Sequence, residues 1–138
     1  MFVDEQNNRI AHLGFIQGII ARMGANSFLL KGWSVTLVAA MAALAAKDAD
    51  KSFFLLAFFP VFIFWWLDGF YLHTEKLYRR LYEKVADGRL SSEKFNLDVT
   101  ELKCEVPGVL AVMFSKTLLP FHLVVIGVVL LTMFVLCR

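Results

Sequence analysis

Two long apolar segments joined by a short link constrain this chain more than any other feature. Residues 28–46 and 52–72 carry one formal charge each, Lys31 in the first segment and Asp68 in the second. A run of about 20 apolar residues is long enough to cross a bilayer as a helix. Because the link covers only residues 47–51, the two helices must be antiparallel neighbours. The sequence therefore predicts a transmembrane helical hairpin.

The two charges are predicted to lie at the same depth. Lys31 precedes Ala49 by 18 residues and Asp68 follows it by 19, so at a rise of ~1.5 Å per residue both lie ~27–29 Å from the turn. One interpretation of this intramembrane ion pair is an ion path, proton relay or gate. The interpretation that we favour is structural, because the pair falls near the edge of a ~30 Å hydrocarbon layer and would hold two helices in register.

Composition points to the same protein class. Hydrophobic residues make up 59% of the chain and mean hydropathy is +0.64. Charged residues are 19%, below the ~25% usual in soluble domains. The net charge of +2 is too small to suggest nucleic acid as a partner.

Helices are also expected outside the hairpin. Apolar residues at three- and four-residue steps predict an amphipathic helix over 5–25, followed by a break at 24–27 in which Asn26 or Ser27 caps the next helix. The second span is predicted to continue as a cytoplasmic helix to residue 87. Pro60 is expected to kink it.

The last third of the chain is expected to return to the membrane. Residues 88–106 are predicted to be a connector, 107–117 an interfacial helix and 118–137 a third span. A split of 107–137 into two short membrane segments is the alternative, although 31 residues are too few for two full spans of ~20. The predicted fold is therefore all-α, a polytopic membrane protein with three transmembrane helices and with N-terminal and central cytoplasmic helices.

The positions of lysine and arginine predict the orientation. Eleven of the fourteen lie before or just inside the first span or between the second and third spans. The side of the membrane richer in these residues is cytoplasmic. This rule predicts a cytoplasmic N-terminus and a C-terminus on the opposite side of the membrane.

Small residues and aromatic residues suggest how the spans pack. Rows of small residues let helices approach closely in lipid, and the first span contains such rows. They could mediate homo-oligomerisation, or they could receive the phenylalanine-rich second span of the same chain. The residues of these rows are Gly32, Thr36, Ala39, Ala40 and Ala43, and the residues expected to form an aromatic belt at the inner interface are Trp33, Trp65, Trp66 and Tyr71.

The cytoplasmic end of the second helix offers a candidate contact surface. Tyr78, Arg79, Arg80 and Tyr82 could contact anionic lipid or a soluble cytoplasmic partner. Alternatively, the apolar side of this helix could pack against residues 5–25 or a neighbouring subunit.

No catalytic, cofactor or metal site is predicted. His73 and Glu75 follow Asp68 at offsets that do not converge on a helix, and His12 and His122 are lone histidines in apolar surroundings. No catalytic triad, phosphate loop or zinc-protease motif can be assembled. We therefore expect a protein that is not an enzyme.

Three stretches carry a resemblance to known proteins: residues 26–40 (NSFLLKGWSVTLVAA), residues 66–72 (WLDGFYL) and residues 75–82 (EKLYRRLY). Over about residues 10–85 the chain resembles a group of small bacterial multi-pass membrane proteins of uncharacterised function. This resemblance implies a bacterial inner membrane, so that the C-terminus is expected to be periplasmic. Its architecture is also similar to that of SLATT-type anti-phage membrane effectors. That resemblance implies self-association and perturbation of the membrane on a trigger, although this sequence lacks a recognisable nucleotide-binding domain.

Three functions follow as hypotheses. The leading one is a pore-forming or membrane-perturbing component that acts in defence. The second is a non-conducting membrane anchor or accessory subunit for a soluble partner. The third is a small constitutive channel or transporter.

Overall fold

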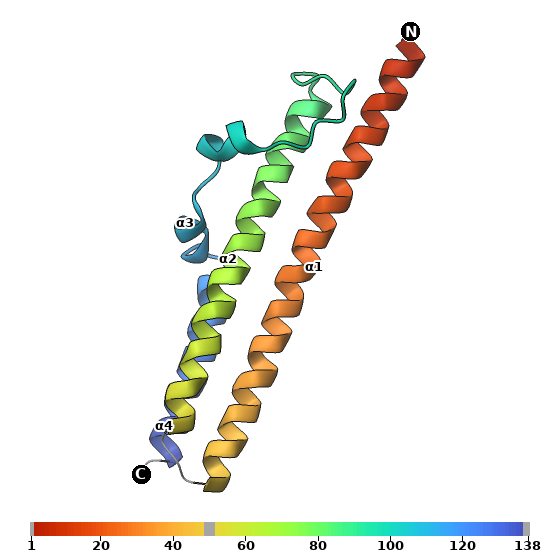
Figure 1. Ribbon diagram of the computed structural model, residues 1–138. Helices are drawn as coiled ribbons and strands as arrows, with labels where there is room; N and C mark the ends of the chain where they lie inside the picture. The colour runs from red at the N-terminus through yellow and green to blue at the C-terminus, as the bar shows by residue number, and fades with distance from the viewer. Residues whose placement is uncertain (1, 49–51, 137–138) are drawn as a thin grey trace.

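The computed structural model describes residues 2–48 and 52–136, and no strand occurs among them. Two long helices, α1 (Phe2–Asp48) and α2 (Ser52–Ala86), form an antiparallel hairpin, and a shorter helix, α4 (Leu119–Leu136), lies beside its lower half (Figure 1). The predicted all-α class is therefore confirmed for this part of the chain. The centre of the predicted link, residues 49–51, and the end of the predicted third span at Cys137 lie outside the described residues.

Helix α1 is a single helix of 47 residues, which corresponds to a length of ~70 Å. The predicted break at residues 24–27, with a cap at Asn26 or Ser27, is wrong. The hydroxyl of Ser27 binds a side chain of α2 instead of a backbone N–H of its own helix. Gly24 lies against Glu75 of α2, so this weak point in helix propensity is covered by tertiary packing.

Helix α2 contains 35 residues and runs through Pro60 without a break. It ends at Ala86, where Gly88 adopts a φ of +71° and donates its N–H to the carbonyl of Val85. Glycine adopts this left-handed conformation without the Cβ penalty of other residues, which makes it a common helix terminator. Asp87 and Gly88 therefore stop the helix.

The upper halves of α1 and α2 enclose an apolar core. This cluster confirms that the N-terminal segment packs against the extension of the second apolar run. A 3₁₀ helix, η1 (Thr100–Glu105), covers it by inserting Leu102 from the connector. The buried residues of the cluster are Ile16, Ile20, Leu77, Leu81, Val85 and Leu102.

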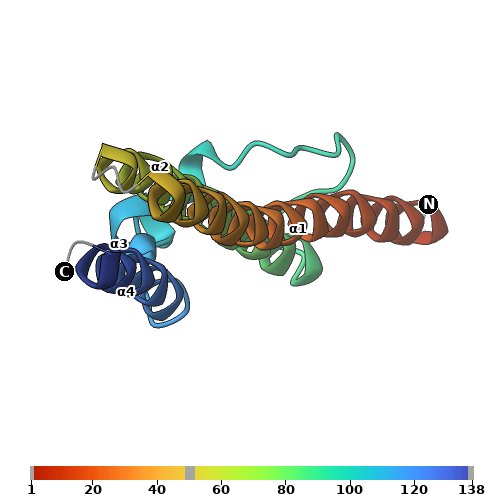
Figure 2. The same cartoon turned by 90° about the horizontal axis from the view of Figure 1, so that it is seen from below.

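The segment after the connector is less helical than expected. Of residues 107–117, only Val109–Met113 form a helix, α3, which lies against α2. Helix α4 then packs beside both α1 and α2, as the end view in Figure 2 shows. The second apolar cluster therefore joins three helices, through Val38, Ala57, Val61, Val125 and Val129.

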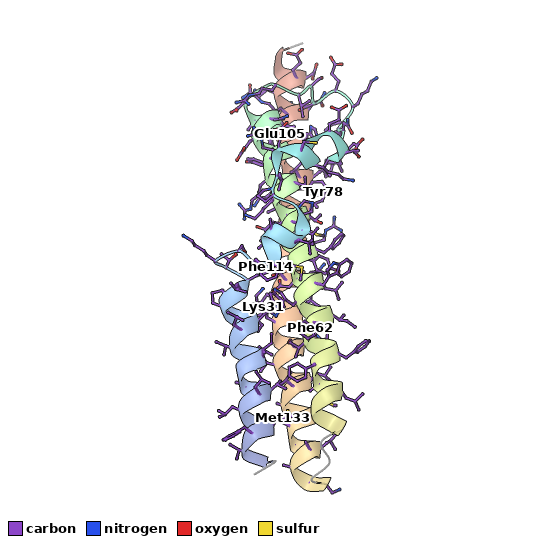
Figure 3. The ribbon with its side chains drawn as sticks, turned by 90° about the vertical axis from the view of Figure 1, so that its left-hand side faces the viewer. Lys31, Phe62, Tyr78, Glu105, Phe114 and Met133 are labelled. Carbon is purple, nitrogen blue, oxygen red and sulfur yellow. The ribbon has the colours of Figure 1, made fainter. Side chains whose placement is uncertain are left out.

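Helices α1 and α2 each contain a segment long and apolar enough to cross a membrane. Only 17% of that segment in α1 and 28% in α2 is buried inside the molecule, so neither resembles the core helix of a soluble domain. Helix α4 is also apolar but shorter, with Leu119–Val135 as its apolar stretch. Large apolar side chains, Phe62 among them, project from the lower half of the bundle (Figure 3).

Candidate functional site

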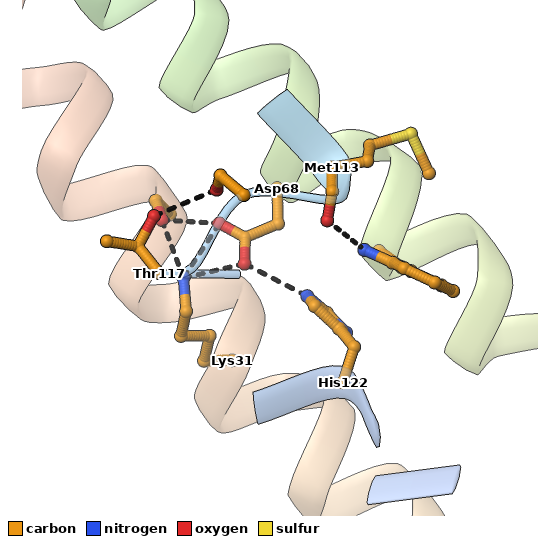
Figure 4. A network of polar contacts seen from close by, with 8 residues as sticks. Lys31, Asp68, Met113, Thr117 and His122 are labelled. Carbon is orange, nitrogen blue, oxygen red and sulfur yellow. Dashed lines mark hydrogen bonds and ion pairs between the residues drawn. The ribbon is translucent and has the colours of Figure 1, made fainter. Parts of the chain in front are cut away.

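The most distinctive polar feature lies at the level where α4 begins. Asp68 of α2 is fully buried, and side chains from two other helices contact its carboxylate (Figure 4). Ser27 and Lys31 come from α1 and His122 comes from α4. We call these four residues the polar cluster.

Lys31 and Ser27 lie one turn apart on α1, so both side chains reach the same carboxylate. The Nζ atom of Lys31 lies 2.6 Å from Oδ2 and 2.8 Å from Oδ1 of Asp68. Lys31 also donates to the hydroxyl of Ser27 at 2.8 Å, and Ser27 donates to Oδ1. Because α1 is continuous here, the hydroxyl and the ammonium group act together on Asp68.

His122 completes the cluster from the third helix. Its Nε2 lies 3.1 Å from Oδ2 of Asp68. A carboxylate only accepts hydrogen bonds, so Nε2 must carry the proton in this contact. Nδ1 is buried and has no hydrogen-bond partner among the described residues. The ring of His122 is therefore held by a hydrogen bond on one side only.

An aromatic side chain fixes the ring of His122. The indole of Trp65 stacks on it with a centroid distance of 5.6 Å and an interplanar angle of 19°. Trp65 in turn donates Nε1–H to the carbonyl of Met113, in α3, at 3.0 Å. A chain of direct contacts thus runs from α3 through Trp65 and His122 to Asp68.

The cluster links three helices through contacts that converge on one carboxylate. The charges of Lys31 and Asp68 cancel, and the carboxylate oxygens are fully occupied by donors. The described residues contain no group of three His, Cys, Asp or Glu side chains that could hold a metal ion. His73 instead contacts the carbonyl of Pro107, and Glu75 binds Arg79, so neither joins Asp68.

The small residues of α1 do not receive the phenylalanine-rich helix, so this alternative is wrong. Gly32, Thr36, Ala39, Ala40 and Ala43 are all exposed, and an added Cβ at Gly32 would meet no atom within 4 Å. We call these five residues the small-residue face. The opposite side of α1, with Ser34 and Val38 buried, packs in the bundle instead.

The expected aromatic belt divides into two groups. Trp33 and Trp66 are 67% and 52% exposed, and Tyr71 is half-buried. The prediction that Trp65 belongs to the belt is wrong, because this side chain is only 8% exposed. It points inward because α3 and α4 cover that side of α2.

The expected cytoplasmic contact surface does not form one free patch. Tyr78 and Tyr82 pack against the upper apolar cluster. Arg79 binds Glu75, and Arg80 binds Glu83 and Glu105. Hydrogen bonds to Glu83 and, to a smaller extent, to Glu105 raise the pKa of Arg80. Hydrogen bonds from Lys84 and, to a smaller extent, from Arg80 hold the pKa of Glu105 below its usual range.

Sequence reasoning missed Ser27 and His122 as members of the cluster. The spacing of Ser27, four residues before Lys31, was available as a signal. His122 lies 14 residues before Leu136, which corresponds to ~21 Å along a helix. This depth resembles that of Asp68 in α2, so depth counting from the other end of the bundle could have found it.

No family model, curated protein or solved structure matches the chain.

Proposed function

We propose that this chain is a three-span inner-membrane protein that self-associates through the small-residue face of α1, and that its assembly permeabilises the membrane. The distribution of apolar side chains supports the membrane location. The apolar segments of α1 and α2 are mostly exposed, and the formal charges inside them are neutralised within the bundle. A bilayer is the solvent in which such a surface is stable.

The third helix fits the same environment. Helix α4 has 18 residues, or ~27 Å, against a hydrocarbon layer of ~30 Å. Its Val124, Leu131 and Val135 are each more than 60% exposed. A water-exposed helix of this composition would be unstable, whereas a third span would not.

The exposure of the small-residue face is the observation that carries self-association. Small residues facing lipid make few contacts, whereas a second helix could approach them closely. The same side of α1 continues beyond the membrane segment with further exposed small residues. These are Gly14, Gly18, Ala21 and Ala25.

Copies of α1 in contact would place this face at the centre of an assembly. One protomer of three helices encloses no channel, so any conduction requires several copies around an axis. Self-association and membrane perturbation are also what the resemblance to SLATT-type effectors implies. An anchor for a soluble partner is the competing function, and the ordered upper half of the hairpin would be its docking platform.

Disulfide cross-linking in native membranes tests the interface. Ala43→Cys and Leu44→Cys, each in a Cys104→Ser/Cys137→Ser background, form a matched pair of exposed neighbours on different sides of α1. We expect oxidation to give covalent dimers of Ala43→Cys and few of Leu44→Cys. Equal cross-linking of both variants, or of neither, would overturn the proposed interface.

Dye release from liposomes then tests permeabilisation. The purified protein should release a small anionic dye, and Ala39→Leu should reduce release because a bulky side chain separates the helices. Leu37→Ala, an exposed position beside the face, is the control and should leave release unchanged. An assembly that cross-links through Ala43→Cys but keeps liposomes sealed would reject the pore and favour the anchor.

A further inference from the structure

Three cations that lie above the polar cluster have no partner among the described residues. The side chains of Arg22 in α1, Lys76 in α2 and Lys116 before α4 make no hydrogen bond or ion pair with any described residue. Arg79 and Lys84, by contrast, bind Glu75 and Glu105. The three free cations therefore differ from the paired cations of the same hairpin.

The three cations lie at nearly the same height. Arg22 precedes Lys31 by nine residues and Lys76 follows Asp68 by eight, so they lie ~14 Å and ~12 Å above the polar cluster. Lys116 precedes His122 by six residues, and the bond from the N–H of Leu119 to the carbonyl of Ser115 keeps that stretch close to helical. It therefore lies ~9 Å above the cluster.

The thickness of a bilayer places this height among the headgroups. The lower ends of α1 and α4 lie 17 residues after Lys31 and 14 residues after His122, respectively. These separations correspond to ~21–26 Å along the helices. A hydrocarbon layer of ~30 Å would then extend ~4–9 Å above the cluster. The headgroup layer occupies roughly the next 5–8 Å, which is where the cations lie.

We propose that Arg22, Lys76 and Lys116 form a cationic collar that binds the phosphate groups of anionic lipids. The collar rests on the three-span arrangement proposed above. Residues 19–25, 73–79 and 113–118 contain one acidic side chain, Glu75, and Arg79 occupies it. The collar is therefore positive on all three elements and complements a surface of phosphodiesters.

Tryptophan quenching by brominated lipids measures this preference on the full chain. Trp33 and Trp66 are the exposed reporters, and they lie close to the polar cluster along α1 and α2. The protein is reconstituted in phosphatidylcholine containing either brominated phosphatidylglycerol or brominated phosphatidylcholine. We expect the anionic lipid to be preferred by roughly threefold or more at low salt, and the preference to fall as salt rises.

Charge-matched variants separate the collar from the net charge of the protein. The triple variant Arg22→Gln/Lys76→Gln/Lys116→Gln should bring the quenching ratio close to one. The control triple variant Arg9→Gln/Lys94→Gln/Lys103→Gln removes three cations far from the proposed headgroup layer and should keep the ratio of the original protein. Circular dichroism of both triples checks that they remain helical.

The outcomes are distinguishable from failure of the three-span proposal. Quenching by neither lipid would overturn the membrane location and the collar together. Equal quenching by both lipids in the unmodified protein would overturn the collar alone. An equal fall in both triple variants would also overturn it, because the preference would then follow net charge rather than these three positions.

Discussion

Asp68 is the residue on which the bundle depends most. It carries the charge at the meeting point of α1, α2 and α4, and Lys31 is its ionic partner. A buried ion pair often contributes little net stability, because desolvation offsets the attraction between the charges. Loss of one partner is different, since the remaining charge stays in an apolar environment without compensation.

Single substitutions in this pair should therefore destabilise more than the double substitution. We expect Lys31→Met to lower the free energy of unfolding by about 3–5 kcal/mol, and Lys31→Met/Asp68→Asn by less. Thermal unfolding of the detergent-solubilised protein, followed by circular dichroism, measures both. Equal losses in the single and double variants would contradict the role of the pair as the structural link between α1 and α2.

The depth of Lys31 and Asp68 could be read from the sequence because both are fixed by counting along rigid helices from one link. Ser27 is predicted as a candidate helix cap, which its local context favours, although its spacing from Lys31 is a signal for a shared contact. Depth counting gives the level of His122, but it does not say which side of α4 packs against the hairpin, and no short link ties α4 to it. The inward orientation of Trp65 depended on the same unknown packing.

At the scale of elements, α3 is the contact that carries the connector onto the hairpin. Gly69 lies where the side chain of Met113 meets α2, and an added Cβ there would overlap Cγ of Met113. Met113 also supplies the carbonyl that Trp65 binds. The absence of a side chain at residue 69 is therefore what allows α3 to approach so closely.

Gly69→Ala should displace α3 and weaken the hydrogen bond of Trp65. We expect the free energy of unfolding to fall by about 1–3 kcal/mol, as at other overpacked sites, and the tryptophan emission to shift. Gly127→Ala in α4, where an added Cβ meets no atom within 4 Å, is the matched control and should not shift the emission. If both variants behave alike, Met113 is not held against Gly69.

The attachment of η1 should depend on pH through Glu105. Lys84 and Arg80 lower the pKa of this carboxyl, so its contribution is present above the unfolded pKa and is lost as pH falls through the lower folded pKa. Glu105→Gln should therefore increase hydrogen exchange of residues 100–106 at neutral pH. The difference from the original protein should vanish at acidic pH, after correction for intrinsic rates.

Glu101→Gln serves as the control for this prediction because Glu101 lies in the same 3₁₀ helix and its side chain forms no hydrogen bond or ion pair with another described residue. It should leave the exchange of residues 100–106 unchanged at either pH. A difference for Glu105→Gln that persisted below the folded pKa would show that the glutamine alters packing rather than charge.

Element boundaries were predictable only where chemistry is local. The stop at Gly88 follows from the conformational freedom of glycine and agrees with the end of α2. The continuity of α1 through Gly24 and Ser27 did not follow, because contacts with Glu75 and Asp68 override weak local propensity. The packed side of α1, which carries the buried residues Ser34 and Val38, did not follow either, because sequence periodicity alone does not say which side α2 and α4 occupy.

At the scale of the whole molecule, the two halves of the hairpin have opposite surfaces. The upper half has an apolar core beneath charged side chains such as Arg80 and Glu105, whereas the lower half exposes apolar side chains and buries its charges. Water suits the first pattern and lipid the second. The polar cluster lies where one pattern gives way to the other, so a displacement of α3 would reach the lower half of the bundle through Trp65 and His122.

This division predicts which positions a membrane-impermeant reagent can reach from each side of the membrane. Cys104 is exposed in η1, while Lys47 and Val135 are exposed at the lower ends of α1 and α4. Single-cysteine proteins carrying Cys104, Lys47→Cys or Val135→Cys, with the remaining native cysteines replaced by serine, can be treated with a membrane-impermeant maleimide. We expect intact spheroplasts to be labelled at the latter two positions and inverted vesicles at Cys104.

Labelling of Cys104 and Lys47→Cys from the same side would exclude a spanning hairpin. Labelling of Val135→Cys from the side of Cys104 would instead remove α4 from the set of spans, leaving a hairpin whose polar cluster is completed by a helix that does not cross.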